Sequence, residues 1–190
     1  MSIKDLEAVL KSSEHLDRKL SAAVKAMQRG LGGFPHERLH QEAIAQYLQA
    51  DRCFLYVRDP QTRYGKAAFC YCRRRDVPDV SSDEWEQEKP ELEAKDPMFA
   101  AALSCKPTVY VEDVKTAAPE VVNRDFEAQE FGHRALIHAH LCEAGELWGI
   151  LQPCVFGNPR HWSVGDREFI DLAVDKLTPL VKQYVRENIS

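Results

Sequence analysis

Two histidines and a cysteine alternate along one short segment of the chain, as His138, His140 and Cys142. Alternate residues of a β-strand point to the same face of a sheet, so a strand here would place the three side chains in one row. Imidazole and thiolate groups are ligands that zinc, copper and iron accept. The pattern therefore gives the hypothesis of a metal site made by these three residues. Its alternative is an exposed or water-filled polar sheet face whose histidines are hydrogen-bonded.

Cysteine chemistry gives a second hypothesis. The chain has six cysteines, none of them in a C-x-x-C pair or a zinc-finger spacing, which favours free thiols over a disulfide framework. Cys154 is followed by two basic residues, Arg160 and His161. Because cationic neighbours favour the reactive thiolate form, Cys154 is a candidate redox centre or nucleophile. The alternative is that it fills space as a small apolar residue.

Hydrophobic spacing predicts the elements that must position these groups. Helices are expected at residues 3–31, 35–49, 98–103 and 164–186, and strands at 52–58, 66–73, 108–111, 134–142 and 147–154. Asp96 before Pro97 is a typical helix N-cap, and Ser163 with Asp166 forms a capping-box pattern. Residues 76–95 are charged and without a clear period, so a loop is expected there, whereas the acidic, mixed segment 112–131 is expected to be part helix and part loop.

This order of elements predicts an α+β fold. Hairpins at both ends of the strand series indicate an antiparallel sheet, with the N- and C-terminal helices packed together on one face. No repeat or low-complexity linker divides residues 1–190, so we expect one domain. Its parts are an N-terminal helix in residues 1–33, a core in 34–162 and a C-terminal helix in 163–190.

Bulk composition excludes two classes of function. The net charge is −5 over 190 residues, without the basic footprint that nucleic-acid binding requires. No apolar run approaches the roughly 18 residues that span a bilayer. The first residues carry acidic side chains and do not resemble a signal peptide. We therefore expect a cytoplasmic protein that uses neither nucleic acid nor membrane as a partner.

Four motifs in order resemble GAF domains, in particular the bilin-binding branch found in phytochromes and cyanobacteriochromes. They are Asp51-Arg52-Cys53-Phe54-Leu55-Tyr56, Lys106-Pro107-Thr108-Val109-Tyr110-Val111-Glu112-Asp113-Val114, Glu146-Leu147-Trp148-Gly149-Ile150-Leu151 and Pro159-Arg160-His161-Trp162. The last two belong to a segment similar to L-W-G-L-L-x-x-H-x-C-x-x-P-R-x-W. The resemblance implies a GAF/PAS-like antiparallel sheet with a small-molecule pocket on it.

The resemblance also shows where this chain differs from the bilin-binding residues of the family. The family attaches its bilin to a Cys-His pair where this chain has Asn123-Arg124, and its pocket histidine falls where this chain has Cys154. Covalent attachment is therefore not expected, and a noncovalent tetrapyrrole or another small molecule is the implied ligand. The residues that we expect to bind it are Cys154, Gln152, Phe131, His133 and His138.

The resulting hypothesis is a stand-alone sensory or regulatory domain, not an enzyme. It would signal through protein contacts, as a homodimer joined by its terminal helices, to a partner on a separate chain. One alternative is a redox sensor or thiol-based reductase that uses the pocket cysteines and histidines or a metal. The other is a degenerate GAF domain that acts only as an interaction scaffold.

Overall fold

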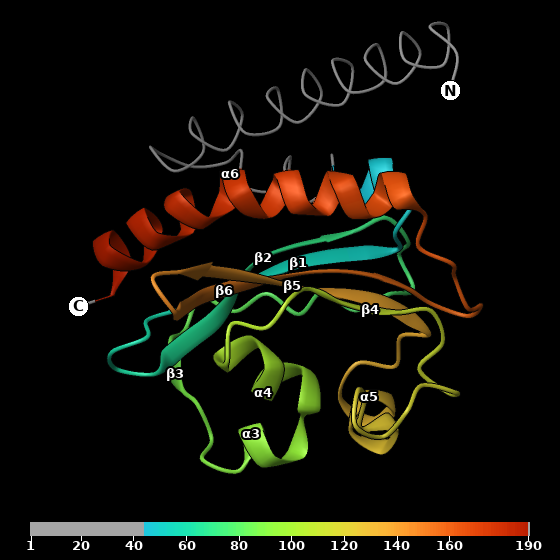
Figure 1. The fold of residues 1–190 in the computed structure, drawn as a ribbon, viewed down its shortest axis with the longest axis horizontal. Coiled ribbons are helices and arrows are strands. Elements are labelled where there is room, and N and C mark those ends of the chain that lie inside the picture. Colours follow the sequence, from blue (N-terminus) through green and yellow to red (C-terminus); the bar gives the residue numbers. More distant parts are fainter. Residues whose placement is uncertain (1–43, 190) are drawn as a thin grey trace, which may run out of the picture.

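A six-stranded sheet forms the centre of the molecule in the computed structural model, which describes residues 44–189 (Figure 1). Its strands are β1 Arg52–Arg58, β2 Tyr64–Cys72, β3 Glu86–Gln87, β4 Val109–Val111, β5 Ala135–Glu143 and β6 Glu146–Val155. The helices are α3 Leu92–Lys95, α4 Pro97–Leu103, α5 Arg124–Glu130 and α6 Val164–Asn188. The strand order is β3-β2-β1-β6-β5-β4, with every neighbouring pair antiparallel.

Helix α6 covers one face of the sheet, which we call the α6 face (Figure 1). The helix begins with the expected capping box, in which the side chains of Ser163 and Asp166 each accept a bond from the other residue's backbone N–H. Its apolar stripe packs on every second residue of the strands, such as Leu55 and Val57 of β1. Residues 44–48 are helical and join the same core cluster. The helix expected at 3–31 and the first part of that at 35–49 lie outside the described residues.

The opposite face, which we call the α4 face, is covered by α3, α4, α5 and the segments that join them (Figure 1). Met98 and Phe99 of α4 are buried against it, and Asp96 caps α4 by accepting a bond from the Met98 N–H, as expected. The segment expected to be a loop at 76–95 also contains the two-residue strand β3 and the one-turn helix α3. The predicted α+β fold with an antiparallel sheet is thus confirmed, with short helices on its second face.

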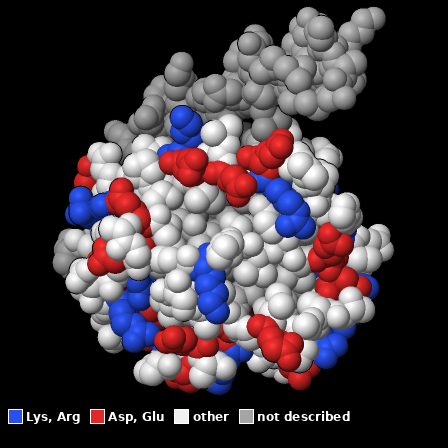
Figure 2. All heavy atoms as spheres, viewed as in Figure 1, with Lys and Arg blue, Asp and Glu red and all other residues white. Residues whose placement is uncertain are grey.

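The surface carries charge of both signs. Figure 2 shows acidic and basic side chains around a largely uncharged centre, with no broad area of a single sign on that face. Within residues 44–189, none of the helices combines the length and the apolar character that crossing a bilayer requires.

Candidate functional site

Alternate side chains of strand β1 point to opposite faces of the sheet, one face apolar and the other largely polar. Cys53 and its alternate neighbours join the core under α6, whereas Arg52, Phe54 and Arg58 point to the α4 face. Strands β5 and β6 add further polar side chains to that face, namely His138, His140 and Gln152. Each polar residue named here is at most 5% exposed. The α4 face is therefore a buried sheet surface with an unusual density of polar groups.

His138 and His140 form a hydrogen-bonded pair on β5. The Nδ1 of His140 lies 2.7 Å from the carbonyl oxygen of Lys106, which can only accept, so this nitrogen donates. In a neutral ring its Nε2 then accepts from Nδ1 of His138, at 2.9 Å. Burial lowers the pKa of His138 well below its usual value, and the charges of His140 and His133 lower it further. The pair is therefore neutral at physiological pH.

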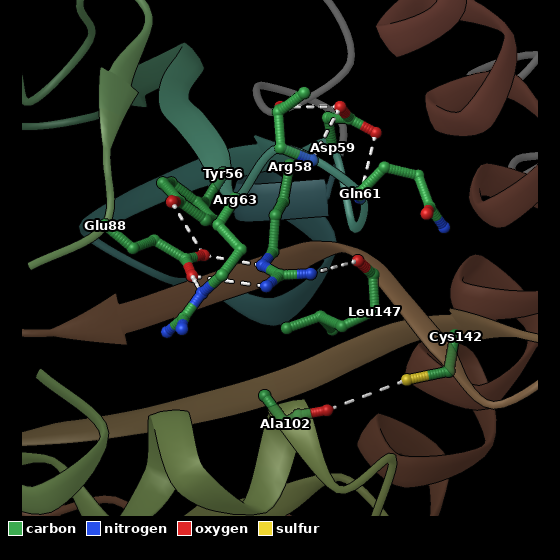
Figure 3. Close-up of polar contacts among 10 residues, drawn as sticks. Tyr56, Arg58, Asp59, Gln61, Arg63, Glu88, Ala102, Cys142 and Leu147 are labelled. Carbon is green, nitrogen blue, oxygen red and sulfur yellow. Dashed lines mark hydrogen bonds and ion pairs between the residues drawn. The ribbon is translucent and has the colours of Figure 1, made fainter. Parts of the chain in front are cut away.

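Cys142, the third residue of the predicted metal set, is engaged elsewhere. Its Sγ lies 3.8 Å from the carbonyl oxygen of Ala102, to which it donates (Figure 3). Burial and the neighbouring thiol of Cys105 raise the pKa of Cys142 to about 12, so the group is a thiol and not a thiolate. Over the part of the chain that the structure describes, no three His, Cys, Asp or Glu side chains are placed to hold a metal ion. The structure thus does not bring these three residues together around one point.

His133 lies at the centre of a charged cluster beneath α5. Its Nε2 is in ion-pair contact with the carboxylate of Glu127, although the contact lacks the angles of a regular hydrogen bond. Burial by itself lowers the pKa of His133, but contacts with Cys154 and Glu127 outweigh burial and raise it to about 9. Burial and the charge of Glu127 raise the pKa of nearby Asp96 to about 6. His133 is therefore a buried imidazolium with a carboxylate partner.

Aromatic rings connect this cluster to β1. Phe131 stacks on His133, with ring centroids 5.5 Å apart and planes inclined by 15°, and it also stacks on Phe54 at 6.2 Å and 10°. Gln152 is the register partner of Phe54 on the adjacent strand. Cys154 is fully buried in an apolar cluster with Met98 and others. The five residues predicted to bind a ligand thus all lie on, or directly against, the α4 face.

Sequence reasoning missed several buried charged residues of this region, among them Arg52, Glu127 and the carboxyl group of Asp96. Arg52 had a signal, because an arginine within an otherwise apolar strand is costly to bury. Glu127 had none, since its period-free segment gave no indication of which side chain would face inward.

A cleft of about 530 Å³ lies elsewhere, at the edge of the sheet beside β4. It is lined by residues 110–113, 116–118, 121 and 159–161. Its charged side chains are partly committed to one another, since Nδ1 of His161 lies 2.7 Å from the Glu112 carboxylate. None of the five predicted ligand residues lines this cleft.

Known structures share this fold. The chromophore-binding domain of an unusual bacteriophytochrome from R. palustris superposes with a TM-score of 0.69 at 14% identity, over 93% of this chain and 63% of that one. This chain thus spans less than two thirds of that domain. A phycoerythrobilin-bound GAF domain from a cyanobacterial phytochrome superposes with a TM-score of 0.65 at 17% identity, over 93% of this chain and 97% of that one. The structure of a far-red absorbing dark state with bound biliverdin IXα superposes with a TM-score of 0.65 at 11% identity, over 87% of this chain and 98% of that one.

The comparison with curated proteins gave no match. A family model, in contrast, matches most of the chain: the GAF domain model aligns with residues 39–177, from before β1 to the middle of α6. That range contains the whole sheet and all the residues of the α4 face. The chain therefore belongs to the GAF domain family.

Proposed function

We propose that this chain is a sensory or regulatory domain that binds a small molecule on the α4 face. The observation that carries the proposal is the burial of cationic, amide and imidazole groups on a sheet face where packing alone would favour apolar residues. Arg52, His133, His138 and Gln152 are all at most 4% exposed. Polar groups held by a rigid sheet within an apolar and aromatic wall are what orient a ligand in small-molecule sites.

The first candidate ligand is a noncovalently held tetrapyrrole. Two structures with this fold are described as carrying phycoerythrobilin and biliverdin, which motivates the choice. Where the resemblance locates the attachment pair, Asn123 caps α5 through its side chain and Arg124 donates to the carbonyl oxygen of Lys115. Neither residue supplies a thiol, so a bound bilin would be held by contacts alone.

The visible absorption spectrum tests this candidate. The full chain, purified from cells that make haem and bilins and then titrated with biliverdin, is expected to acquire a visible band that denaturation in acidic urea releases. Phe131→Ala should weaken this binding, whereas Val164→Ala, at a position that is 73% exposed on α6, should not. A spectrum without a visible band, even with added biliverdin, would exclude the tetrapyrrole.

A second candidate function, thiol-based redox sensing, is favoured by the position of Cys154, a buried thiol close enough to His133 to influence its pKa. Peroxide oxidises a reactive cysteine to a sulfenic acid, and a basic neighbour such as His133 can accept the proton of the thiol. Cys53 is the internal control, because burial raises its pKa well above the usual value. Mass spectrometry after peroxide treatment should show Cys154 oxidised before Cys53, and His133→Gln should abolish the difference. Equal rates in the wild type would contradict this function.

For signalling, we propose a homodimer joined by its terminal helices, which acts on a separate partner protein. Helix α6 supports the proposal, because it packs along the back of the strands whose other face would hold the ligand. Light scattering coupled to size-exclusion chromatography should give twice the mass of one chain. A scaffold function would instead predict that substitutions on the α4 face leave partner binding unchanged.

A further inference from the structure

Arg52 is a buried cation with an incompletely used guanidinium group. The residue is 0% exposed, and its Nη1 donates to the carbonyl oxygen of Pro78 at 3.1 Å. Its Nε and Nη2 are buried without a hydrogen-bond acceptor among residues 44–189. The guanidinium carbon lies 5.5 Å from the ring centroid of Phe54 and 5.2 Å from that of Phe156. Aromatic faces attract a cation but do not satisfy its N–H donors.

The same strand shows how a buried arginine is satisfied in this protein. Arg58 lies six residues further along β1, on the same face, and its Nη1 also donates to a backbone carbonyl, that of Leu147 at 3.4 Å. Its Nε and Nη2 bind the two oxygens of the Glu88 carboxylate at 2.5 and 3.2 Å (Figure 3). Arg52 thus repeats the arrangement of Arg58 except for the carboxylate.

A third arginine uses the same edge of its guanidinium. Nε and Nη2 of Arg134 bind the two oxygens of Asp113 at 2.6 and 2.8 Å. The carboxylate next to Arg52 in sequence, that of Asp51, is already engaged. It pairs with Arg73 and Arg74 and accepts from the backbone N–H of Phe156.

We propose that the Nε–Nη2 edge of Arg52 binds the carboxylate of a small molecule, whose unsaturated or aromatic body lies against Phe54 and Phe156. The inference rests on the proposed function, because it assigns a chemical class to the ligand of the same face. Two parallel N–H groups match the two oxygens of a carboxylate. The strand neighbours of Arg52 across the ladder, Cys72 and Cys154, add no cationic donors. A phosphate, with more charge and more oxygens to satisfy, fits this edge less well.

The guanidinium of Arg52 is hydrogen-bonded to an exposed part of the chain. Pro78, whose carbonyl bonds Arg52, is itself exposed and belongs to the stretch between β2 and β3, which has no regular secondary structure up to β3. The stretch around Pro78 is therefore the part of the chain that we expect a ligand to displace in order to reach the guanidinium. The sheet and its ladder would stay intact.

Paired substitutions test whether the guanidinium of Arg52 lacks a partner in the ligand-free protein. Arg52→Met removes a buried charge that has no carboxylate partner within residues 44–189, so the ligand-free full chain should melt at an equal or higher temperature than the wild type. Arg58→Met is the matched control on the same strand, and it should melt lower because it leaves the buried Glu88 unpaired. A loss with Arg52→Met as large as that with Arg58→Met, or a failure of Arg52→Met to fold, would show that Arg52 already has a structural partner. That result would overturn the proposal.

Selectivity for the carboxylate is then measured first on the wild type. The probes are biliverdin against its dimethyl ester, and phenylacetate against phenylacetamide, each titrated by fluorescence or ligand-observed NMR. At least one acid should bind about tenfold or more tightly than its neutral partner, since a buried charge-assisted pair is lost in the latter. Arg52→Met should abolish that preference. Equal binding of acid and neutral form would overturn the carboxylate site and leave the proposed function standing, whereas no binding of any probe would count against both.

Discussion

The imidazole of His133 and the carboxylate of Glu127 form an ion pair from which water is excluded, with 0% and 1% of the two side chains exposed. The pKa of His133 is raised from 6.5 to about 9, so the folded protein holds a proton that the unfolded chain releases earlier. The stability contributed by this proton is fully present below pH 6.5 and is lost as the pH rises through 9.

The first prediction follows from this pair. Between pH 6.5 and 9 the wild type should lose up to about 3 kcal/mol of its free energy of unfolding relative to His133→Gln, which has no proton to lose. Urea denaturation of both proteins at several pH values measures the difference. Parallel stability curves for the two proteins across this range would contradict a protonated His133.

The second prediction concerns the N-cap of α4. Because burial and Glu127 raise the pKa of Asp96 from 3.8 to about 6, its ionised form is disfavoured in the folded protein. The penalty is absent below pH 3.8 and fully present above pH 6. Asp96→Asn keeps a side-chain acceptor for the N–H of Met98, so it should be more stable than the wild type at neutral pH.

Two controls sharpen this test. The advantage of Asp96→Asn should vanish as the pH falls toward 4, where the wild-type carboxyl is neutral. Asp96→Ala loses the cap itself and should cost about 1 kcal/mol relative to Asp96→Asn at every pH. An Asn variant that is less stable than the wild type at pH 7 would mean that the charge of Asp96 is needed, through its attraction to His133.

The third prediction concerns Glu88, whose carboxylate is bound by Arg58 and Arg63 (Figure 3). Glu88→Ala should lower the free energy of unfolding by about 3–5 kcal/mol, because it leaves the buried Arg58 without a partner. Glu86→Ala, two residues away and exposed, is the control and should change stability by less than about 0.5 kcal/mol. Similar costs for the two variants would show that the pair contributes no more than a surface contact.

The local features of the fold were predictable from sequence because the forces behind them act over a few residues. A run of β-favouring residues gave β1 with its observed bounds, and the capping patterns of α4 and α6 followed from Asp96 and Ser163. Strand β3 has two residues and α3 has four, which is too short for any period to appear. Glu88, directly after β3, pairs with Arg58, 30 residues away, and such a tertiary contact leaves no mark in the local sequence.

The candidate site was predictable only in part, for the same reason. The residues that the resemblance to GAF domains selected lie on one sheet face, and Phe131, His133 and Cys154 lie together there. His138, His140 and Cys142 lie on one face of β5, as predicted. Lying on one face does not, however, determine the direction in which each side chain points. Local acceptors, the carbonyl groups of Lys106 and Ala102, decide their orientation, and strand periodicity cannot reveal these.

The fourth prediction concerns the contact between the sheet and α6. A Cβ atom at Gly149 would lie 2.6 Å from the backbone oxygen of Tyr56 and 3.2 Å from Cγ1 of Val181. The oxygen belongs to β1, which is paired with β6 at this point, so it cannot move away without disturbing the ladder. Gly149→Ala should therefore cost about 1–3 kcal/mol of stability, as overpacking in a core does.

Gly165→Ala is the matched control, since its Cβ would meet only the Ser163 hydroxyl at 3.8 Å in the first turn of α6. It should leave stability unchanged or raise it by up to about 1 kcal/mol, because alanine is the better helix former. If ligand binding on the α4 face is transmitted to α6, Gly149→Ala should also weaken that coupling, because β6 contacts both α4 and α6. Chemical denaturation with and without biliverdin measures stability and coupling together. A Gly149 variant as stable as the Gly165 variant would show that the sheet and α6 separate easily at this point, which would make β6 a poor route for the signal.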